Sequence, residues 1–259
     1  MRAAWVAGTA AVATMLALSA CSGDPPPDPS PPTAIGPQAD RDLLAGMAAA
    51  AKDRRYVATY TLVTPRRADR TVTVAIGTDG TWVVAIPGGG LSGLADMAMY
   101  GNRTELYQCV LGATAGASAR PDLTITAGCV KTKLGTKTDP RVHHIFTDWI
   151  DPLIDRATAL SVAATATLPG ADGSCFSVQS NSAALAPPVD PGTYCYRGDG
   201  MLTAAKASFG TLMLAGASAT APPSVTMPAA VVSRDPVPMT APPAPPKPTP
   251  TASSSAQPG

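Results

Sequence analysis

Four cysteines form two groups with the same internal spacing, and this pattern predicts disulfide chemistry. Cys109 and Cys129 are twenty residues apart, as are Cys175 and Cys195. Four cysteines allow three pairings, and the chain order and equal spacing favour Cys109–Cys129 and Cys175–Cys195. Each bridge would join neighbouring strands and stabilise the fold by about 3 kcal/mol. A zinc site is the alternative, but the sequence has no CxxC pair and both histidines lie elsewhere.

The two histidines are adjacent, His143-His144, and Asp148 follows them. Imidazole and carboxylate groups bind metals and transfer protons. Adjacent residues of an α-helix point about 100° apart, so we do not expect both imidazoles to reach one ion. His144 and Asp148 share a helix face and offer a single weak ligand pair. A capped or surface histidine is the more common role, and we expect no metal site.

The chain lacks the short motifs of common catalytic and phosphate-binding sites. Gly90-Leu91-Ser92-Gly93 matches a serine-nucleophile motif only loosely, and no lysine-serine pair follows Gly88-Gly89-Gly90 at the spacing of a phosphate loop. The formal net charge of +1, with 14% charged residues, provides no basic field for nucleic acid. We therefore expect no enzyme activity, no catalytic residues, no cofactor and no nucleic-acid partner.

A fifth cysteine, Cys21, ends an export-signal pattern. Met1-Arg2 carries a positive charge, and an apolar run extends from Ala3 to Ala20. The sequence Leu18-Ser19-Ala20-Cys21 resembles the bacterial lipobox, which implies that residues 1–20 are a signal peptide and that Cys21 carries a lipid. Two acyl chains anchor a protein stably. We therefore expect attachment to the outer face of the cell membrane. An ordinary secretory signal with a coincidental cysteine is the alternative.

Composition divides the exported chain into three parts. Residues 21–38 begin with Cys21 and continue as a proline-rich segment, which predicts an extended tether. Residues 39–232 are expected to form one globular domain, which is long enough for a substantial core. Residues 233–259 are rich in Pro, Ala, Ser and Thr and are expected to be a disordered tail.

The first half of the domain has the pattern of a helix followed by strands. Asp40 is a candidate N-cap for a helix whose apolar residues, such as Leu43 and Met47, recur at helical spacing. Positive charge near Arg55 suits the helix C-terminus. Asp79-Gly80 predicts a tight hairpin turn, because this dipeptide tolerates positive φ. Alternating apolar residues predict strands at 56–63, 71–76, 81–86, 97–100 and 104–111.

The middle of the domain is expected to be helical, and the last third returns to strands. Asp139-Pro140 resembles a helix start, and Asp151-Pro152 repeats that signal, which predicts a break or kink. The strands of the last third are expected at 160–167, 175–179, 193–197, 201–208 and 210–214.

This order of elements predicts an α+β fold: a curved antiparallel sheet, or open half-barrel, with helices covering its concave face. It resembles the lipoprotein-carrier half-barrel superfamily, which includes periplasmic lipoprotein carriers and actinobacterial envelope lipoproteins. Residues 192–195, 199–204 and 210–214 resemble the closing hairpin of such proteins. The resemblance implies that acyl chains lie between sheet and helices. The paired cysteines depart from it, and its motifs assign no lipid-binding residue.

Apolar residues from one strand and from the helical insert are candidates for lining such a cavity. They are Trp82, Val84, Ile86, Ile145, Trp149, Ile150 and Leu153. The alternative is that they pack together as a solid core. Burying each such side chain stabilises a fold by about 1.5–3 kcal/mol, which is sufficient reason for their presence. Both interpretations remain open at the level of the sequence.

These observations favour a membrane-anchored extracytoplasmic lipoprotein that binds a lipid or another amphiphilic envelope molecule without covalent chemistry. The alternative is a solid-core scaffold that engages a protein of the cell envelope or the cell wall and has no small-molecule ligand. A hydrolase of envelope polymer is a third hypothesis. No 20–50-residue repeat is evident in the sequence.

Overall fold

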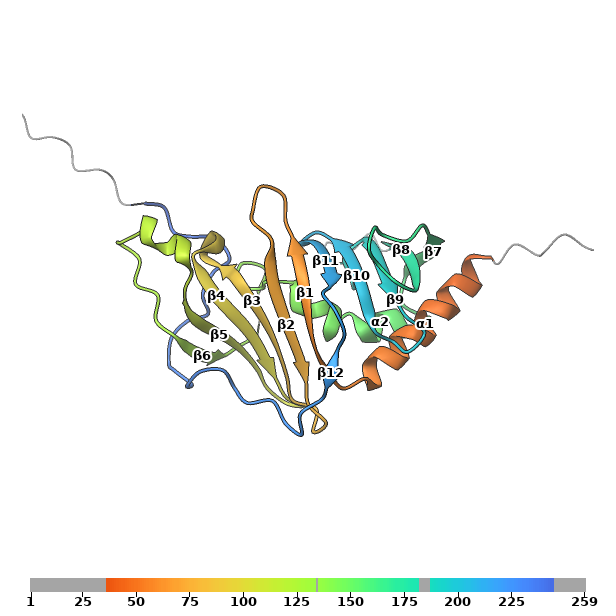
Figure 1. Ribbon diagram of the computed structural model, residues 1–259, viewed down its shortest axis with the longest axis horizontal. Helices are drawn as coiled ribbons and strands as arrows, with labels where there is room; N and C mark the ends of the chain where they lie inside the picture. The colour runs from red at the N-terminus through yellow and green to blue at the C-terminus, as the bar shows by residue number, and fades with distance from the viewer. Residues whose placement is uncertain (1–35, 134, 182–186, 245–259) are drawn as a thin grey trace, which may run out of the picture. The chain divides into compact units, whose positions relative to one another are not determined.

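One antiparallel sheet organises the computed structural model, which describes residues 36–133, 135–181 and 187–244. In spatial order the strands run β6-β5-β4-β3-β2-β1-β11-β10-β9-β8-β7, and β12 pairs with β1 (Figure 1). Their bounds are β1 Tyr56–Val63, β2 Arg70–Ile76, β3 Trp82–Gly90, β4 Ala95–Gly101, β5 Leu106–Ala113, β6 Gly128–Lys131, β7 Leu160–Thr165, β8 Ser174–Ser180, β9 Gly192–Tyr196, β10 Leu202–Ala207, β11 Gly210–Leu214 and β12 Ala219–Thr220.

The helical elements are few and mostly short. They are α1 Pro37–Asp53, α2 Ile150–Ile154 and three 3₁₀ helices, η1 Leu91–Gly93, η2 Ala115–Ala119 and η3 Val142–Phe146. Within the described residues, no helix is long and apolar enough to cross a bilayer. Cys21, residues 22–35 of the tether and residues 245–259 lie outside the described residues, whereas Pro37 and Gln38, which were predicted to belong to the tether, begin α1.

The strand predictions from the alternating pattern are confirmed, with small differences at the ends. The predicted bounds of β1 and β11 coincide with those of the structure, and the Asp79-Gly80 turn joins β2 to β3. Gly80 has a φ of 90°, the left-handed conformation that such a turn requires. The strands β6 and β12 were not predicted, because four and two residues are too short to show alternation.

The helix predictions need two corrections. The first helix begins at Pro37 and its N-cap is Gly36, not Asp40. Asp40 instead accepts a hydrogen bond from the backbone amide of Ala164, at 2.8 Å. The expected helix after Asp139-Pro140 is the 3₁₀ helix η3, and α2 starts later, at Ile150. Arg141 has a φ of 57°, and a left-handed residue cannot continue a right-handed helix.

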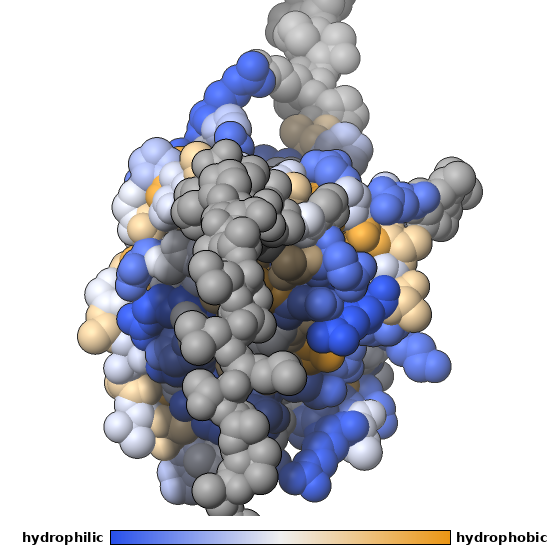
Figure 2. All heavy atoms as spheres, turned by 90° about the vertical axis from the view of Figure 1, so that its right-hand side faces the viewer, coloured by the Kyte–Doolittle hydropathy of each residue, from blue (hydrophilic) through white to orange (hydrophobic). Residues whose placement is uncertain are grey.

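The main core lies between the sheet and the helical elements. On β1, alternate residues from Tyr56 to Leu62 are buried, as a strand with one buried face requires. These side chains share one apolar cluster with Leu44 of α1 and Leu153 of α2. The same cluster receives side chains from β2, β3 and β7–β11. In the view of Figure 2, the coloured residues are mostly hydrophilic, with small hydrophobic areas between polar ones.

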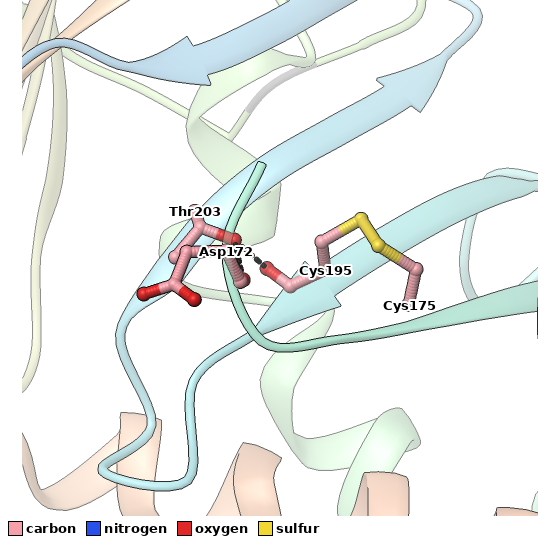
Figure 3. The surroundings of a disulfide bond; sticks show 4 residues. All are labelled: Asp172, Cys175, Cys195 and Thr203. Atoms are coloured by element: carbon pink, nitrogen blue, oxygen red, sulfur yellow. Dashed lines mark hydrogen bonds between the residues drawn. A yellow bond between two sulfur atoms is a disulfide. The ribbon is translucent and has the colours of Figure 1, made fainter. Parts of the chain in front are cut away.

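The disulfides Cys109–Cys129 and Cys175–Cys195 are both formed, which confirms the predicted pairing. The first joins directly opposite residues of β5 and β6, and the second does the same for β8 and β9. Near the second bridge, the hydroxyl of Thr203 lies within hydrogen-bond distance of the carbonyl oxygens of Asp172 (2.5 Å) and Cys195 (3.2 Å) (Figure 3). Each bridge lies in a small apolar cluster separate from the main core.

The folded domain extends past the predicted boundary at Val232. Residues 222–244 run beside the strands β3 to β6, as the blue segment of Figure 1 shows. Past Val232, the side chains of Val237 and Ala241 pack against the apolar cluster that contains Leu91 and Val110. Residues 233–244, which were predicted to be part of a disordered tail, therefore contact the domain. Proline-rich composition removes amide donors but leaves carbonyl acceptors, and strand-edge and loop amides of the domain use those carbonyls.

Candidate functional site

A pocket of about 460 Å³ lies where the β2–β3 and β4–β5 turns meet the C-terminal end of α1 and the helical insert. Its apolar lining comes from Ile76 and Trp82 of the sheet and from Phe146 and Ile150 of the insert. Phe146 and Ile150 are buried, whereas Ile76 and Trp82 are half-buried. The pocket therefore has an apolar floor that is continuous with the main core.

Trp82 is positioned by the absence of a side chain on the next strand. Trp82 and Gly101 are directly opposite each other in the β3–β4 pairing. A Cβ atom on Gly101 would lie 2.5 Å from the indole ring, a distance that real Cβ contacts do not show. Glycine at this position lets the indole lie against the backbone of β4, so that it can line the pocket.

Three basic side chains border the apolar floor. Lys52 at the end of α1 is exposed and pairs with Asp151 at 2.7 Å. Arg55 donates only to the backbone carbonyl oxygens of Lys52 and Arg54. Arg103, in the β4–β5 turn, has no carboxylate partner among the described residues, and neither has Arg55. The rim thus presents two exposed guanidinium groups that form no ion pair with a described carboxylate.

The seven predicted cavity residues have different positions in the structure. Trp82 and Ile150 line this pocket, and Ile86 lines a smaller one of about 260 Å³ beside Arg141 and Phe209. The other four are buried in the main core and line neither of these two pockets. They are Val84, Ile145, Trp149 and Leu153.

A second group of polar side chains lies in the helical insert, close to this pocket. His143 stacks on Trp82 with ring centroids 6.1 Å apart, and its ring is 4.1 Å from that of His144. Asp139 and Asp148 flank the two imidazoles, each within 3.9 Å of both. The rings are thus closer than the angle between adjacent residues of an α-helix suggested, and both lie beside the same two carboxylates.

His143 is fully buried, and neither of its ring nitrogens has a hydrogen-bond partner among the described residues. Burial, followed by the charge of His144, lowers the pKa of His143 to about 3. Burial also acts to lower the pKa of His144, but hydrogen bonds to Asp139 and Asp148 outweigh it and raise that pKa to about 9. A buried polar atom without a hydrogen-bond partner lowers the stability of a fold by about 1–3 kcal/mol, so His143 destabilises the core in which it lies.

Sequence reasoning missed most of the polar groups of both sites. It assigned no ligand-binding role to Lys52, Arg55 or Arg103. Arg103 is far from the other two in the chain and meets them only because two hairpin turns and a helix end adjoin. One signal was present: Arg103 follows Gly101-Asn102 in a predicted turn. Asp139 was interpreted as a helix cap, but its carboxylate lies 2.7 Å from His144.

A search of the sequence against known protein families found no match. A search of curated protein sequences found no match either.

Proposed function

We propose that this protein is an extracytoplasmic lipoprotein that binds an anionic amphiphile without covalent chemistry. In this proposal a lipid on Cys21 anchors the chain to the outer face of the cell membrane. The open sheet is a half-barrel whose concave face is covered by α1, η3 and α2, and the ligand enters at the pocket beside Trp82. The shared apolar cluster of sheet and helices supports this arrangement.

The observation that carries the proposal is the composition of the pocket of about 460 Å³. An apolar floor with a few placed polar groups is the usual construction of a small-molecule site. The floor here suits hydrocarbon, and the rim groups Arg55 and Arg103 suit a phosphate or carboxylate headgroup. A ligand with both parts would satisfy both surfaces at once, which a purely polar or purely apolar molecule would not.

A solid-core scaffold remains the second candidate, and a specific observation favours it. Tyr60, Tyr194 and Phe176 are fully buried in the middle of the core, where a carrier of long acyl chains would need space. In this alternative the pocket is a surface recess, and the protein acts through partners of the envelope. The two candidates differ in whether hydrocarbon reaches Trp82.

Fluorescence quenching of Trp82 tests this difference. The protein is mixed with vesicles containing phosphatidylglycerol brominated on its acyl chains, and with vesicles of brominated phosphatidylcholine. We expect saturable quenching by the anionic lipid, weaker quenching by the zwitterionic lipid, and loss of the signal in Trp82→Phe. Quenching that persists in Trp82→Phe, or no quenching by either lipid, would contradict amphiphile binding and favour the scaffold.

Charge variants test the headgroup side of the proposal. Arg55→Gln and Arg103→Gln together should weaken binding of the anionic lipid by about 10-fold or more, since a charged hydrogen bond contributes about 1.5–3 kcal/mol. Lys133→Gln together with Lys137→Gln is the matched control, because both are exposed cations outside the pocket and the pair removes the same charge. Equal effects of the pocket variant and the control would mean that only net charge matters.

The anchor is tested separately from the ligand. Cys21→Ala should release the protein from the membrane fraction while both disulfides and the thermal unfolding midpoint stay unchanged. Retention of the variant in the membrane fraction would contradict the lipid anchor and leave the ligand proposal to the quenching experiment.

A further inference from the structure

Four side chains of the helical insert, Asp139, His143, His144 and Asp148, form one compact cluster. Asp139 precedes η3, both histidines belong to η3, and Asp148 follows it. Asp139, His143 and His144 each offer one ligand atom, and these atoms all lie within 4.8 Å of one another. Imidazole nitrogens and a carboxylate oxygen are the donor set of zinc and related transition metals.

His143 gives this cluster a feature that a simple ion-pair network does not explain. Its side chain is fully buried, and both ring nitrogens lack hydrogen-bond partners among the described residues. The face of the ring stacks on Trp82, while its edges point at carboxylates: Nδ1 is 3.8 Å from Asp139 Oδ1, and Nε2 is 3.9 Å from Asp148 Oδ2. Buried polar groups are normally satisfied, and coordination to a metal would satisfy one of these nitrogens.

The distances between these ligand atoms are close to those of a coordination site. With metal–nitrogen distances near 2.0–2.1 Å, two ligand atoms of a tetrahedral site are about 3.3 Å apart. His144 Nε2 lies 2.7 Å from Asp139 Oδ2, and His143 Nδ1 lies 3.8 Å from Asp139 Oδ1. One distance is somewhat shorter than required and the other somewhat longer. Small rotations of three side chains would therefore be sufficient to place one ion among them.

Asp148 occupies the position of an outer carboxylate. Its Oδ2 atom lies 2.7 Å from Nδ1 of His144, on the opposite side of the ring from Asp139. Metal-bound histidines usually donate their second ring N–H to a carboxylate, which fixes the tautomer and the ring orientation. If the hydrogen of the neutral imidazole is on Nδ1, facing Asp148, then Nε2 of His144 carries no hydrogen and can bind an ion beside Asp139.

We propose that Asp139, His143 and His144 bind one divalent transition-metal ion of the zinc class, with Asp148 orienting His144. The ion would fasten the loop before η3 to η3 itself and hold the stack of His143 on Trp82. This inference does not depend on the ligand proposed for the pocket. Three protein ligands leave a fourth position on zinc, as in sites where zinc also holds water.

Metal binding is measured on the full chain with both disulfides intact, purified without a histidine tag and stripped with a chelator. Titration with Zn²⁺, followed by calorimetry and by elemental analysis after gel filtration, should give one ion per chain. Co²⁺ should give the visible absorption of a low-coordinate site with nitrogen ligands. Mg²⁺ and Ca²⁺ prefer oxygen ligands and should not compete. No stoichiometric Zn²⁺ would overturn the proposal and leave an aspartate–histidine ion-pair network.

Variants identify the ligands. Asp139→Asn and His144→Gln should each abolish stoichiometric binding, and Asp148→Asn should weaken it about 10- to 100-fold. Asp151→Asn is the control, because Asp151 is an exposed carboxylate of the same insert that pairs with Lys52. Circular dichroism in chelator shows which variants fold. His143→Gln replaces a fully buried ring and could fail to fold. In that case the variants of the partly exposed residues, Asp148→Asn and His144→Gln, test the site. Equal Zn²⁺ affinity in Asp139→Asn and Asp151→Asn would overturn the assignment.

Discussion

Single residues determine where the functional groups of this domain can lie. Gly101 leaves the space that the indole of Trp82 occupies. Arg141, whose φ is positive, is the N-cap of η3, so η3 begins only after it. Arg141 is held in place by an ion pair with the buried carboxylate of Asp190, which also accepts from Ser208. These local constraints position both the pocket and the histidine cluster.

Buried tyrosines predict a loss of stability at alkaline pH. Burial raises the pKa of Tyr56 to about 12, although a hydrogen bond with Tyr60 and the charge of Arg54 oppose this. The unfolded tyrosine releases its proton near pH 10, so between pH 10 and about 12 the unfolded state binds fewer protons than the native state. Stability must therefore fall as pH rises through this range. Urea unfolding at pH 8 and 11 should show a smaller fall for Tyr56→Phe than for the unsubstituted protein.

For each protein, the quantity to compare is the change in the free energy of unfolding between pH 8 and pH 11, because removal of the hydroxyl also changes stability at pH 8. Identical differences in the variant and the unsubstituted protein would contradict the assignment of the alkaline transition to Tyr56.

Each disulfide stabilises a short strand that hydrogen bonds alone hold weakly. β6 has four residues, and its pairing with β5 includes the directly opposite cysteines Cys109 and Cys129. β9 has five residues and is joined to β8 in the same way by Cys175–Cys195. The first bridge joins β6, the last strand of the order, to its neighbour β5, whereas the second joins β8 and β9, which each have a strand on both sides.

Removal of either bridge should therefore destabilise the domain. Replacing both cysteines of one pair by alanine should cost about 3 kcal/mol for a loop of this length. In a domain of this size, that loss lowers the unfolding midpoint by about 6–12 °C. Scanning calorimetry of each double variant measures the shift. A change of only about 1 °C, or free thiols at these four positions in native protein, would contradict the structural role of the bridges.

The whole molecule is held together by pairings between distant parts of the chain. β1 lies between β2 and β11, so the last long hairpin returns to the first strand and joins the two halves of the sheet. The C-terminal segment then crosses the other half. Gln108, fully buried on β5, donates to the carbonyl of Val237 and accepts from its amide. Residues 233–244 are therefore part of the fold.

Truncation tests this boundary. A chain ending at Val232 should be less stable than one ending at Ala244 by at least about 2 kcal/mol, because a net hydrogen bond contributes about 1 kcal/mol and the shorter chain loses both bonds to Gln108. It also loses the contacts of Arg234 with the carbonyl oxygens of Thr126 and Gly128. Urea unfolding of the two chains measures the difference. Equal midpoints would place the end of the domain at Val232, as the composition suggested.

The local pattern of the sequence determined most strands, the β2–β3 turn and the cysteine pairing, because alternation, turn residues and cysteine spacing act over a few residues. It also carries the prediction of a lipid on Cys21, which remains to be tested. Only the tertiary structure decided that β11 pairs with β1, that residues 233–244 pack on the sheet, and that Arg55, Arg103 and Trp82 border one pocket. Those contacts join residues far apart in the chain, so their energy depends on the complete fold and leaves no periodic signal in the sequence.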